Sequence, residues 1–201
     1  MLNMKKHVIA AAVLCSLTTL SAVAQQSKDG PWMVRARLVQ LDSANSDNTG
    51  LGLTVNNKLI ADLDVTYFIN KNIAVELLLT VAQKHNVFSN GTAIGSLKQL
   101  PPTVTVQYHF DGYAVKPYVG AGINYTQFSS VNILGGNATL DSNSWGGALQ
   151  AGVDIPLSGN MYLNVDLKKI QIGTDVFAGG VKAGTFKVDP LLLGVGVGWR
   201  F

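Results

Sequence analysis

The chain ends in the stretch VDPLLLGVGVGWRF (residues 188–201), in which every second residue from Leu193 to Phe201 is apolar. The residues between them are three glycines and Arg200. A period of two places the two sets on opposite faces of a β-strand, whereas an α-helix needs a period near 3.6 residues. This stretch therefore predicts a strand with one large apolar face and one face that is small or charged.

Seven further segments alternate in the same way. They are residues 32–41, 59–68, 73–82, a segment ending at Phe110, and residues 116–128, 144–155 and 161–172. The connections alternate between long ones (42–58, 83–99, 129–143 and 173–187) and short ones (69–72, 111–115 and 156–160). Repeated alternation over about ten residues, with short periplasmic turns and long extracellular loops, is typical of outer-membrane barrels.

A soluble β-sandwich also alternates, but the unequal connections and the aromatic residues near strand ends favour a membrane barrel. These aromatic residues are Trp32, Tyr67, Tyr108, Phe110, Trp145, Trp199 and Phe201. The predicted fold is all-β: an eight-stranded antiparallel transmembrane β-barrel of the outer membrane, with short periplasmic turns and long extracellular loops.

The composition agrees with contact with lipid. Only 13% of the 201 residues are charged, about half the fraction usual in soluble proteins, and the mean hydropathy is +0.24. The net charge of +3 is too small to indicate nucleic-acid binding.

The N-terminus has the features of a secretory signal peptide: Lys5 and Lys6, a mostly apolar run over residues 8–20, and the small residues Ala22 and Ala24. We predict a signal peptide over residues 1–24 and the barrel over 25–201, integral to the bacterial outer membrane. Cys15 is the only cysteine of the chain, so the exported part would contain neither a disulfide nor a thiol nucleophile.

Several motifs resemble the OmpW family of Gram-negative outer-membrane proteins, in the order in which that family has them. Along the chain they are Asn56-Asn57, Lys84-His85, LPPT (100–103), PYVGAGINYT (117–126), NSWG (143–146), GVD (152–154), VDPL (188–191) and GWRF (198–201). The resemblance implies an eight-stranded barrel with a hydrophobic channel for small apolar molecules. The terminal Phe201 resembles the signal that the outer-membrane assembly machinery reads.

Strand parity divides the predicted lumen in two. Polar inward residues toward the periplasm and at mid-depth would form a polar plug of Arg35, Arg37, Asp64, Glu76, His109, Asp154, Asp166, Lys168 and Arg200. Apolar inward residues toward the outside would line a hydrophobic funnel, open to the outside, of Val39, Ile60, Leu78, Phe128, Ile170, Ile172 and Leu192. An eight-stranded barrel is just wide enough for its side chains to fill, so the plug would block straight passage.

A molecule in such a funnel would leave sideways through the wall into the membrane. Proline removes a ladder donor, which makes Pro101, Pro102 and Pro190 candidates for a wall opening. Proline is also common at strand starts, so these residues could equally mark strand ends. We expect the inward glycines near residues 120 and 196 to make room for Tyr118, Tyr162 and Arg200.

The sequence thus predicts a passive channel for small hydrophobic molecules, with outer-membrane lipid, its permeants and the assembly machinery as partners. Two alternatives stay open, namely a plugged barrel whose long loops bind a partner, and a narrow ion pore. Enzymatic activity is not expected, because Ser144 and Ser158 lack a G-x-S-x-G context. No cofactor or metal is expected, because the histidines His85 and His109 fall near opposite ends of the barrel. The oligomeric state is not fixed by the sequence.

Overall fold

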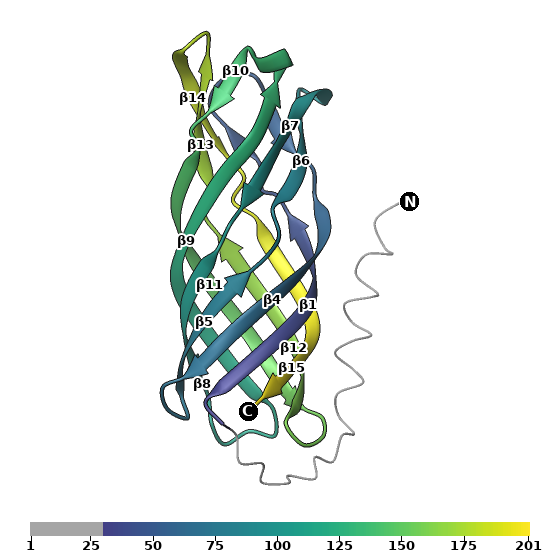
Figure 1. The fold of residues 1–201 in the computed structure, drawn as a ribbon, viewed down its shortest axis with the longest axis vertical. Coiled ribbons are helices and arrows are strands. Elements are labelled where there is room, and N and C mark those ends of the chain that lie inside the picture. Colours follow the sequence, from purple (N-terminus) through teal and green to yellow (C-terminus); the bar gives the residue numbers. More distant parts are fainter. Residues whose placement is uncertain (1–29) are drawn as a thin grey trace, which may run out of the picture.

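The structure is a computed structural model that describes residues 30–201, so the predicted signal peptide lies outside the described residues. Eight strands form a closed antiparallel barrel, which confirms the predicted fold (Figure 1). They are β1 (Trp32–Asp42), β4 (Lys58–Phe68), β5 (Ile73–Leu79), β8 (Thr103–His109), β9 (Lys116–Ile133), β11 (Asn143–Pro156), β12 (Met161–Ile170) and β15 (Leu191–Arg200). Pairing of β15 with β1 closes the ring, so each of the eight strands has a paired neighbour on both sides.

Short turns join the strands at one end of the barrel, and all the long connections lie at the other (Figure 1). The long connections contain strands of their own, which sequence reasoning did not predict. They are β2 (Ser46–Asp47), β3 (Leu53–Val55), β6 (Gln83–Ser89), β7 (Thr92–Leu100), β10 (Ala138–Leu140), β13 (Gly173–Ala178) and β14 (Val181–Lys187), with a 3-10 turn at Leu134–Gly136. These strands and the outer part of β9 form a second tier above the barrel, in the order β3-β6-β7-β9-β10-β13-β14-β2.

Side chains join the two ends of this second tier. Asn45 Oδ1 accepts a hydrogen bond from the Val55 amide, and Asn45 Nδ2 donates to the Val55 carbonyl oxygen. The Leu53 amide donates to Asp47 Oδ2. Partial burial acts to raise the pKa of Asp47, but hydrogen bonds from the Thr49 and Leu53 amides outweigh burial and lower that pKa. The second tier is therefore tied into a nearly complete ring.

Burial alternates along the barrel strands as the period of two predicts. Outward residues such as Leu38, Leu59 and Leu149 are more than 60% exposed, while their inward neighbours are buried. Such an apolar outer band matches the lipid-facing surface of an outer-membrane barrel. Within residues 30–201, no helix is long and apolar enough to cross a membrane.

Candidate functional site

The interior of the barrel is polar toward the short-turn end and apolar toward the long-loop end. The polar half is built around Arg35, which is completely buried. Its Nε and Nη2 atoms donate to the two carboxylate oxygens of Asp154, at 3.1 and 2.7 Å. Its Nη1 atom donates to Asp64 Oδ1 at 3.1 Å and to Thr66 Oγ1 at 2.8 Å. Every donor group of this guanidinium is thus directed at an oxygen, as a buried cation requires.

A second arginine extends this network toward the apolar half. Arg37 Nε and Nη2 donate to the two carboxylate oxygens of Asp62, at 3.0 and 3.3 Å. Its Nη2 atom also lies 2.9 Å from Asp64 Oδ2, an ion-pair contact without hydrogen-bond geometry. Asp62 therefore belongs to the polar half of the lumen.

Lys168 completes the ion-pair network. Its Nζ atom lies 2.5 Å from Glu76 Oε1, and Gln107 and Gln150 donate to Glu76 Oε2 at 2.8 and 3.0 Å. Gln150 Nε2 and the Tyr118 hydroxyl each lie 2.7 Å from Asp166 Oδ2. Charged and neutral polar groups thus form one continuous hydrogen-bonded layer across the lumen.

The network holds three cations against five carboxylates, which is a formal charge of −2. The cations are Arg35, Arg37 and Lys168, and the carboxylates are Asp62, Asp64, Glu76, Asp154 and Asp166. Of the predicted plug residues, His109 joins through Gln107, whose Oε1 lies 2.9 Å from His109 Nε2. Arg200 lies at the short-turn mouth instead, where it covers the Phe68 ring at 3.7 Å and donates to the Gly30 carbonyl oxygen.

Glycines let these large side chains fit inside so narrow a barrel, and Gly196 is among the glycines expected to do so. A Cβ atom on Gly196 would lie 2.0 Å from the Ala36 carbonyl oxygen and 2.7 Å from Arg37 Cγ. A Cβ atom on Gly152 would lie 2.4 Å from the Tyr118 ring. The glycines of β15 therefore make room for the arginines of β1, their partner strand, rather than for Tyr162 and Arg200.

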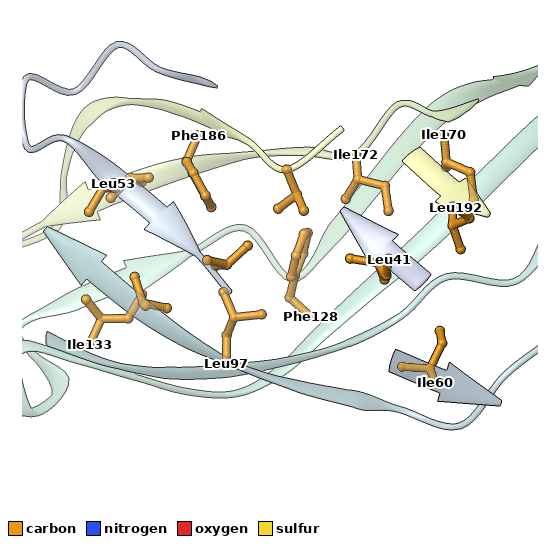
Figure 2. Close-up of a cluster of buried hydrophobic side chains, with 14 of the residues drawn as sticks. Leu41, Leu53, Ile60, Leu97, Phe128, Ile133, Ile170, Ile172, Phe186 and Leu192 are labelled. Carbon is orange, nitrogen blue, oxygen red and sulfur yellow. The ribbon is translucent and has the colours of Figure 1, made fainter. Parts of the chain in front are cut away.

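The apolar half is a cluster of buried side chains contributed by both tiers (Figure 2). Six of the seven predicted funnel residues belong to it: Val39, Ile60, Phe128, Ile170, Ile172 and Leu192. The second tier adds Leu53, Val55, Val87, Leu97, Ile133, Ala138, Val176 and Phe186, and Figure 2 shows Phe128 between the residues of the two tiers. The predicted funnel is open to the outside, whereas here hairpin side chains fill it, because the long connections are hairpins with their own inward apolar faces.

A small cavity of about 20 Å³ lies between the polar and apolar halves. The seventh predicted funnel residue, Leu78, lines it and is 3% exposed. The remaining lining residues are Leu41, Ile60, Asp62, Thr80, Gln83, Gln99, Pro101, Ile170, Ile172, Pro190 and Leu192. One face of the cavity is therefore apolar, while Asp62, Gln83 and Gln99 bring polar groups to it.

The wall beside this cavity lacks a backbone ladder. Strands β4 and β5 pair as far as Leu63 with Leu79, and pairing resumes between β3 and β6 at Val55 with Val87. Between these points, no ladder pairing joins residues 56–62 to residues 80–86 within the described chain. We call this interruption the seam. It spans seven residues on each side, or about 23 Å at about 3.3 Å per residue.

Side chains bridge the upper part of the seam. Lys58 Nζ donates to the Lys84 carbonyl oxygen at 2.9 Å, and Asn56 Oδ1 accepts from the Asn86 amide at 2.8 Å. His85 Nδ1 lies 3.0 Å from the Asn56 carbonyl oxygen. Burial lowers the pKa of His85, a residue of the second tier, and the nearby Lys58 acts in the same direction, against a hydrogen bond to Asn56 that raises it.

The three prolines proposed as wall openings each accept a hydrogen bond through their carbonyl oxygen. Pro101 and Pro190 line the cavity. The Pro102 carbonyl oxygen accepts from the Tyr125 amide, and that of Pro190 accepts from the Ile170 amide, both at 3.1 Å. The carbonyl groups of Pro102 and Pro190 thus bond to neighbouring strands, whereas the seam lacks ladder pairing along its whole length.

The residues considered for other chemistry have structural contacts. Ser144 Oγ accepts a hydrogen bond from the Gly173 amide, and both histidines bond to amide groups. Among residues 30–201, no group of three His, Cys, Asp or Glu side chains is placed to hold a metal ion.

The hairpin residues that fill the funnel were missed by sequence reasoning, although two turn signals mark them. Asn90-Gly91 joins β6 to β7 with φ values of 48° and 84°, and Gly179-Gly180 joins β13 to β14 with 58° and 81°. Such dipeptides are strong indicators of two-residue hairpin turns. Asn90-Gly91-Thr92 also matches the acceptor pattern for glycosylation, but its position here is that of a hairpin turn.

Sequence comparison places this molecule among known outer-membrane proteins. The model of the OmpW family matches residues 28–201. An uncharacterized outer-membrane protein of Sinorhizobium fredii, y4mB, is 40% identical over 183 residues, covering 85% of this chain and 80% of the relative. Outer membrane protein W of Vibrio cholerae is 32% identical over 219 residues, covering 98% of this chain and all of the relative.

Comparison with solved structures gives the same result. The crystal structure of the outer membrane protein OprG from Pseudomonas aeruginosa is similar with a TM-score of 0.75 and 27% sequence identity. The similarity covers 87% of this chain and 97% of that protein. The barrel and its long-loop tier therefore have a counterpart in an experimental structure.

Proposed function

The chain belongs to the OmpW family of outer-membrane barrel proteins, and from that premise we propose that it is a passive channel for small hydrophobic molecules. The observation that carries this proposal is the division of the lumen between an apolar half at the long-loop end and a charged layer below it. In outer-membrane barrels the long loops face outward. A molecule arriving from outside would therefore meet the apolar half first.

The two halves have opposite effects on an apolar molecule. Contact with the apolar cluster removes its surface from water, which stabilises it by about 25 cal/mol per Å². Passage through the ion-pair network would break hydrogen bonds among buried charges such as Arg35 and Asp154, and breaking a buried pair costs about 3–5 kcal/mol. Straight passage into the periplasm is therefore strongly disfavoured, and a sideways route is the alternative.

The seam offers that route. Elsewhere a permeant would have to break a backbone ladder, whereas between residues 56–62 and 80–86 only side-chain bridges such as Lys58 to Lys84 need to part. The seam lies at the outer end of β4, an 11-residue strand. Unpaired backbone groups are costly in hydrocarbon, which favours a position of the seam at the level of the polar headgroups. We infer that permeants leave at this level, with Pro101, Pro102 and Pro190 easing local movement of the wall.

Uptake measurements test the proposal. A small apolar molecule and a charged molecule of similar size would be offered to cells with and without the protein. Faster uptake of the apolar molecule alone is expected. Faster uptake of the charged one would indicate an ion pore instead. No change in either would indicate a plugged barrel that acts through its loops, a function with which the filled apolar half is also compatible.

Cysteine pairs test the route. Ala61→Cys with Val81→Cys places one outward-facing thiol on each side of the seam, and Cys15 is the only native cysteine. Oxidation of this pair should slow apolar uptake to the rate of cells lacking the protein, and reduction should restore it. The control pair Leu63→Cys with Leu79→Cys joins residues that already pair, so its oxidation should change nothing. Equal rates for the oxidised and reduced seam pair would exclude the seam as the route.

Two substitutions test the lining and the wall. Leu192→Asp puts a carboxylate in the apolar cluster and should abolish apolar uptake if the protein is a channel. It should matter little to a barrel that acts through its loops. Pro102→Ala restores a backbone donor beside the Tyr125 contact and should slow uptake, whereas unchanged uptake would remove Pro102 from the wall opening. Folded protein at the cell surface has to be matched between variants in both measurements.

A further inference from the structure

A chain of three hydrogen-bonded groups runs from the seam to the cavity and leaves one atom without a donor. His85 Nδ1 lies 3.0 Å from the Asn56 carbonyl oxygen. Because a carbonyl oxygen only accepts, Nδ1 carries the proton, and in the neutral ring Nε2 is then an acceptor. Burial lowers the pKa of His85, which favours this neutral form.

The tautomer of His85 fixes the orientation of the neighbouring amide. Gln99 Nε2 lies 3.1 Å from His85 Nε2, so the amide nitrogen of Gln99 donates to the ring. Its Oε1 atom, on the other branch of the planar amide, is consequently directed away from the ring. Gln99 is 1% exposed, and Oε1 is a buried acceptor with no hydrogen-bond partner among the described residues. An unfilled buried acceptor is unfavourable, so a donor brought to this position would be bound.

Most of the lining around Gln99 is apolar, and Asp62, Thr80 and Gln83 are the other polar residues of the cavity. Gln99 lines the cavity behind the seam together with Ile60, Leu78 and Leu192. The cavity of about 20 Å³ has room for a group the size of one hydroxyl or water molecule. A larger molecule would have to displace the seam, where side-chain bridges stand in place of a backbone ladder.

We propose that the cavity behind the seam selects apolar molecules that carry a single hydroxyl group, which donates a hydrogen bond to Gln99 Oε1 while the apolar body lies against Ile60, Leu78 and Leu192. This selectivity rests on the proposed channel function and adds a substrate class to it. An alkane or an ether of the same size has no donor and leaves Oε1 unfilled. The polar face of the cavity thus distinguishes alcohols and phenols from hydrocarbons.

Paired molecules test this selectivity. We would measure uptake of 4-propylphenol and of its methyl ether, 4-propylanisole, each relative to cells lacking the protein. One hydrogen bond to a buried acceptor corresponds to a preference of about 5- to 10-fold for the phenol. Gln99→Met keeps the length of the side chain but removes the acceptor, and should reduce the preference to about onefold without slowing the ether. Gln83→Met is the matched control, since Gln83 pairs with Gln99 across β6 and β7 and lines the same cavity. It should retain the preference.

The outcomes separate this inference from the channel itself. Equal acceleration of phenol and ether by the unmodified protein would overturn the selectivity and leave the channel intact. Acceleration of neither would overturn both. Loss of the preference in Gln83→Met as well as in Gln99→Met would show that Gln99 is not the specific acceptor.

A measurement on the unmodified protein avoids any effect of substitution on folding. In protein labelled with ¹³C at the glutamine side-chain carbonyl, the Gln99 resonance should move when 4-propylphenol is added and stay in place with 4-propylanisole. No movement with the phenol, or equal movement with both, would refute the hydrogen bond.

Discussion

Replacement of Arg35 by methionine should destabilise the barrel more than any single surface substitution. Methionine fills a similar volume but removes four hydrogen bonds: two to Asp154, one to Asp64 and one to Thr66. Asp154 would keep the Asn164 amide at 2.8 Å as a donor, and the network would change from a formal charge of −2 to −3. Removing one partner of a buried ion pair costs about 3–5 kcal/mol, and we expect a loss in this range.

The assay is reversible urea unfolding of the barrel in lipid vesicles, followed by tryptophan fluorescence and by the shift of the folded band on electrophoresis. Asp154→Asn in the same protein completes a double-mutant cycle. The neutral amide in Asp154→Asn no longer needs a cation. The double variant should therefore lose about 2 kcal/mol less unfolding free energy than the two single variants lose together. Lys71→Met removes an exposed ion pair with Asp111 and serves as a control without measurable change.

Two results would refute this reasoning. One is a loss below about 1 kcal/mol for Arg35→Met, within the range of exposed ion pairs. The other is strict additivity in the cycle, which would mean that Arg35 and Asp154 do not depend on each other.

Three further predictions concern the glycines and the second tier. Gly196→Ala would place a Cβ atom 2.0 Å from the Ala36 carbonyl oxygen; the pairing of β1 with β15 should be strained by about 1–3 kcal/mol, measurable in the same unfolding assay. Gly91→Ala meets no atom within 4 Å but must adopt a φ of 84°. It should lower the local stability of the hairpin by about 1–2 kcal/mol, seen as faster amide exchange in β6 and β7 only. The third concerns pH: since the pKa of His85 is lowered by folding, the unfolded hairpin binds its proton more readily. Stability is therefore full above about pH 6.5, the ordinary value, and falls as the pH drops toward the folded pKa. Exchange of the β6 amides, corrected for intrinsic rates, should rise between pH 7.5 and 5, and should not do so in His85→Leu.

Strand parity was enough to predict the barrel because lipid and lumen impose opposite demands on successive residues. In β1 the same alternation that turns Leu38 outward turns Arg35 and Arg37 inward. Pairing partners could be inferred in part as well, since the short turns fix neighbouring strands. Acidic and basic residues of the lumen had to meet somewhere within so narrow an interior.

The second tier and the seam could not be obtained in this way. In the hairpin of β6 and β7, the bulge between Val87 and Phe88 interrupts the alternation of apolar and polar residues. Only the turn at Asn90-Gly91 indicates the hairpin in the sequence. The seam depends on which long connection folds over which neighbour, and its side-chain bridges join residues far apart in the sequence, such as Lys58 with Lys84 and Asn56 with Asn86. Such contacts leave no local pattern in the sequence.

The ladders on the two sides of the seam also determine how its two borders are aligned. Ladder pairs on its two sides, Leu63 with Leu79 and Val55 with Val87, share one register: moving eight residues back along one strand moves eight forward along the other. The two ladders therefore set one common register for the residues on the two borders of the seam. A slip by one residue would turn every side chain to the wrong face, and the intact pairs at both ends forbid it. If a permeant parts the seam as proposed, this shared register returns the wall to the same arrangement afterwards.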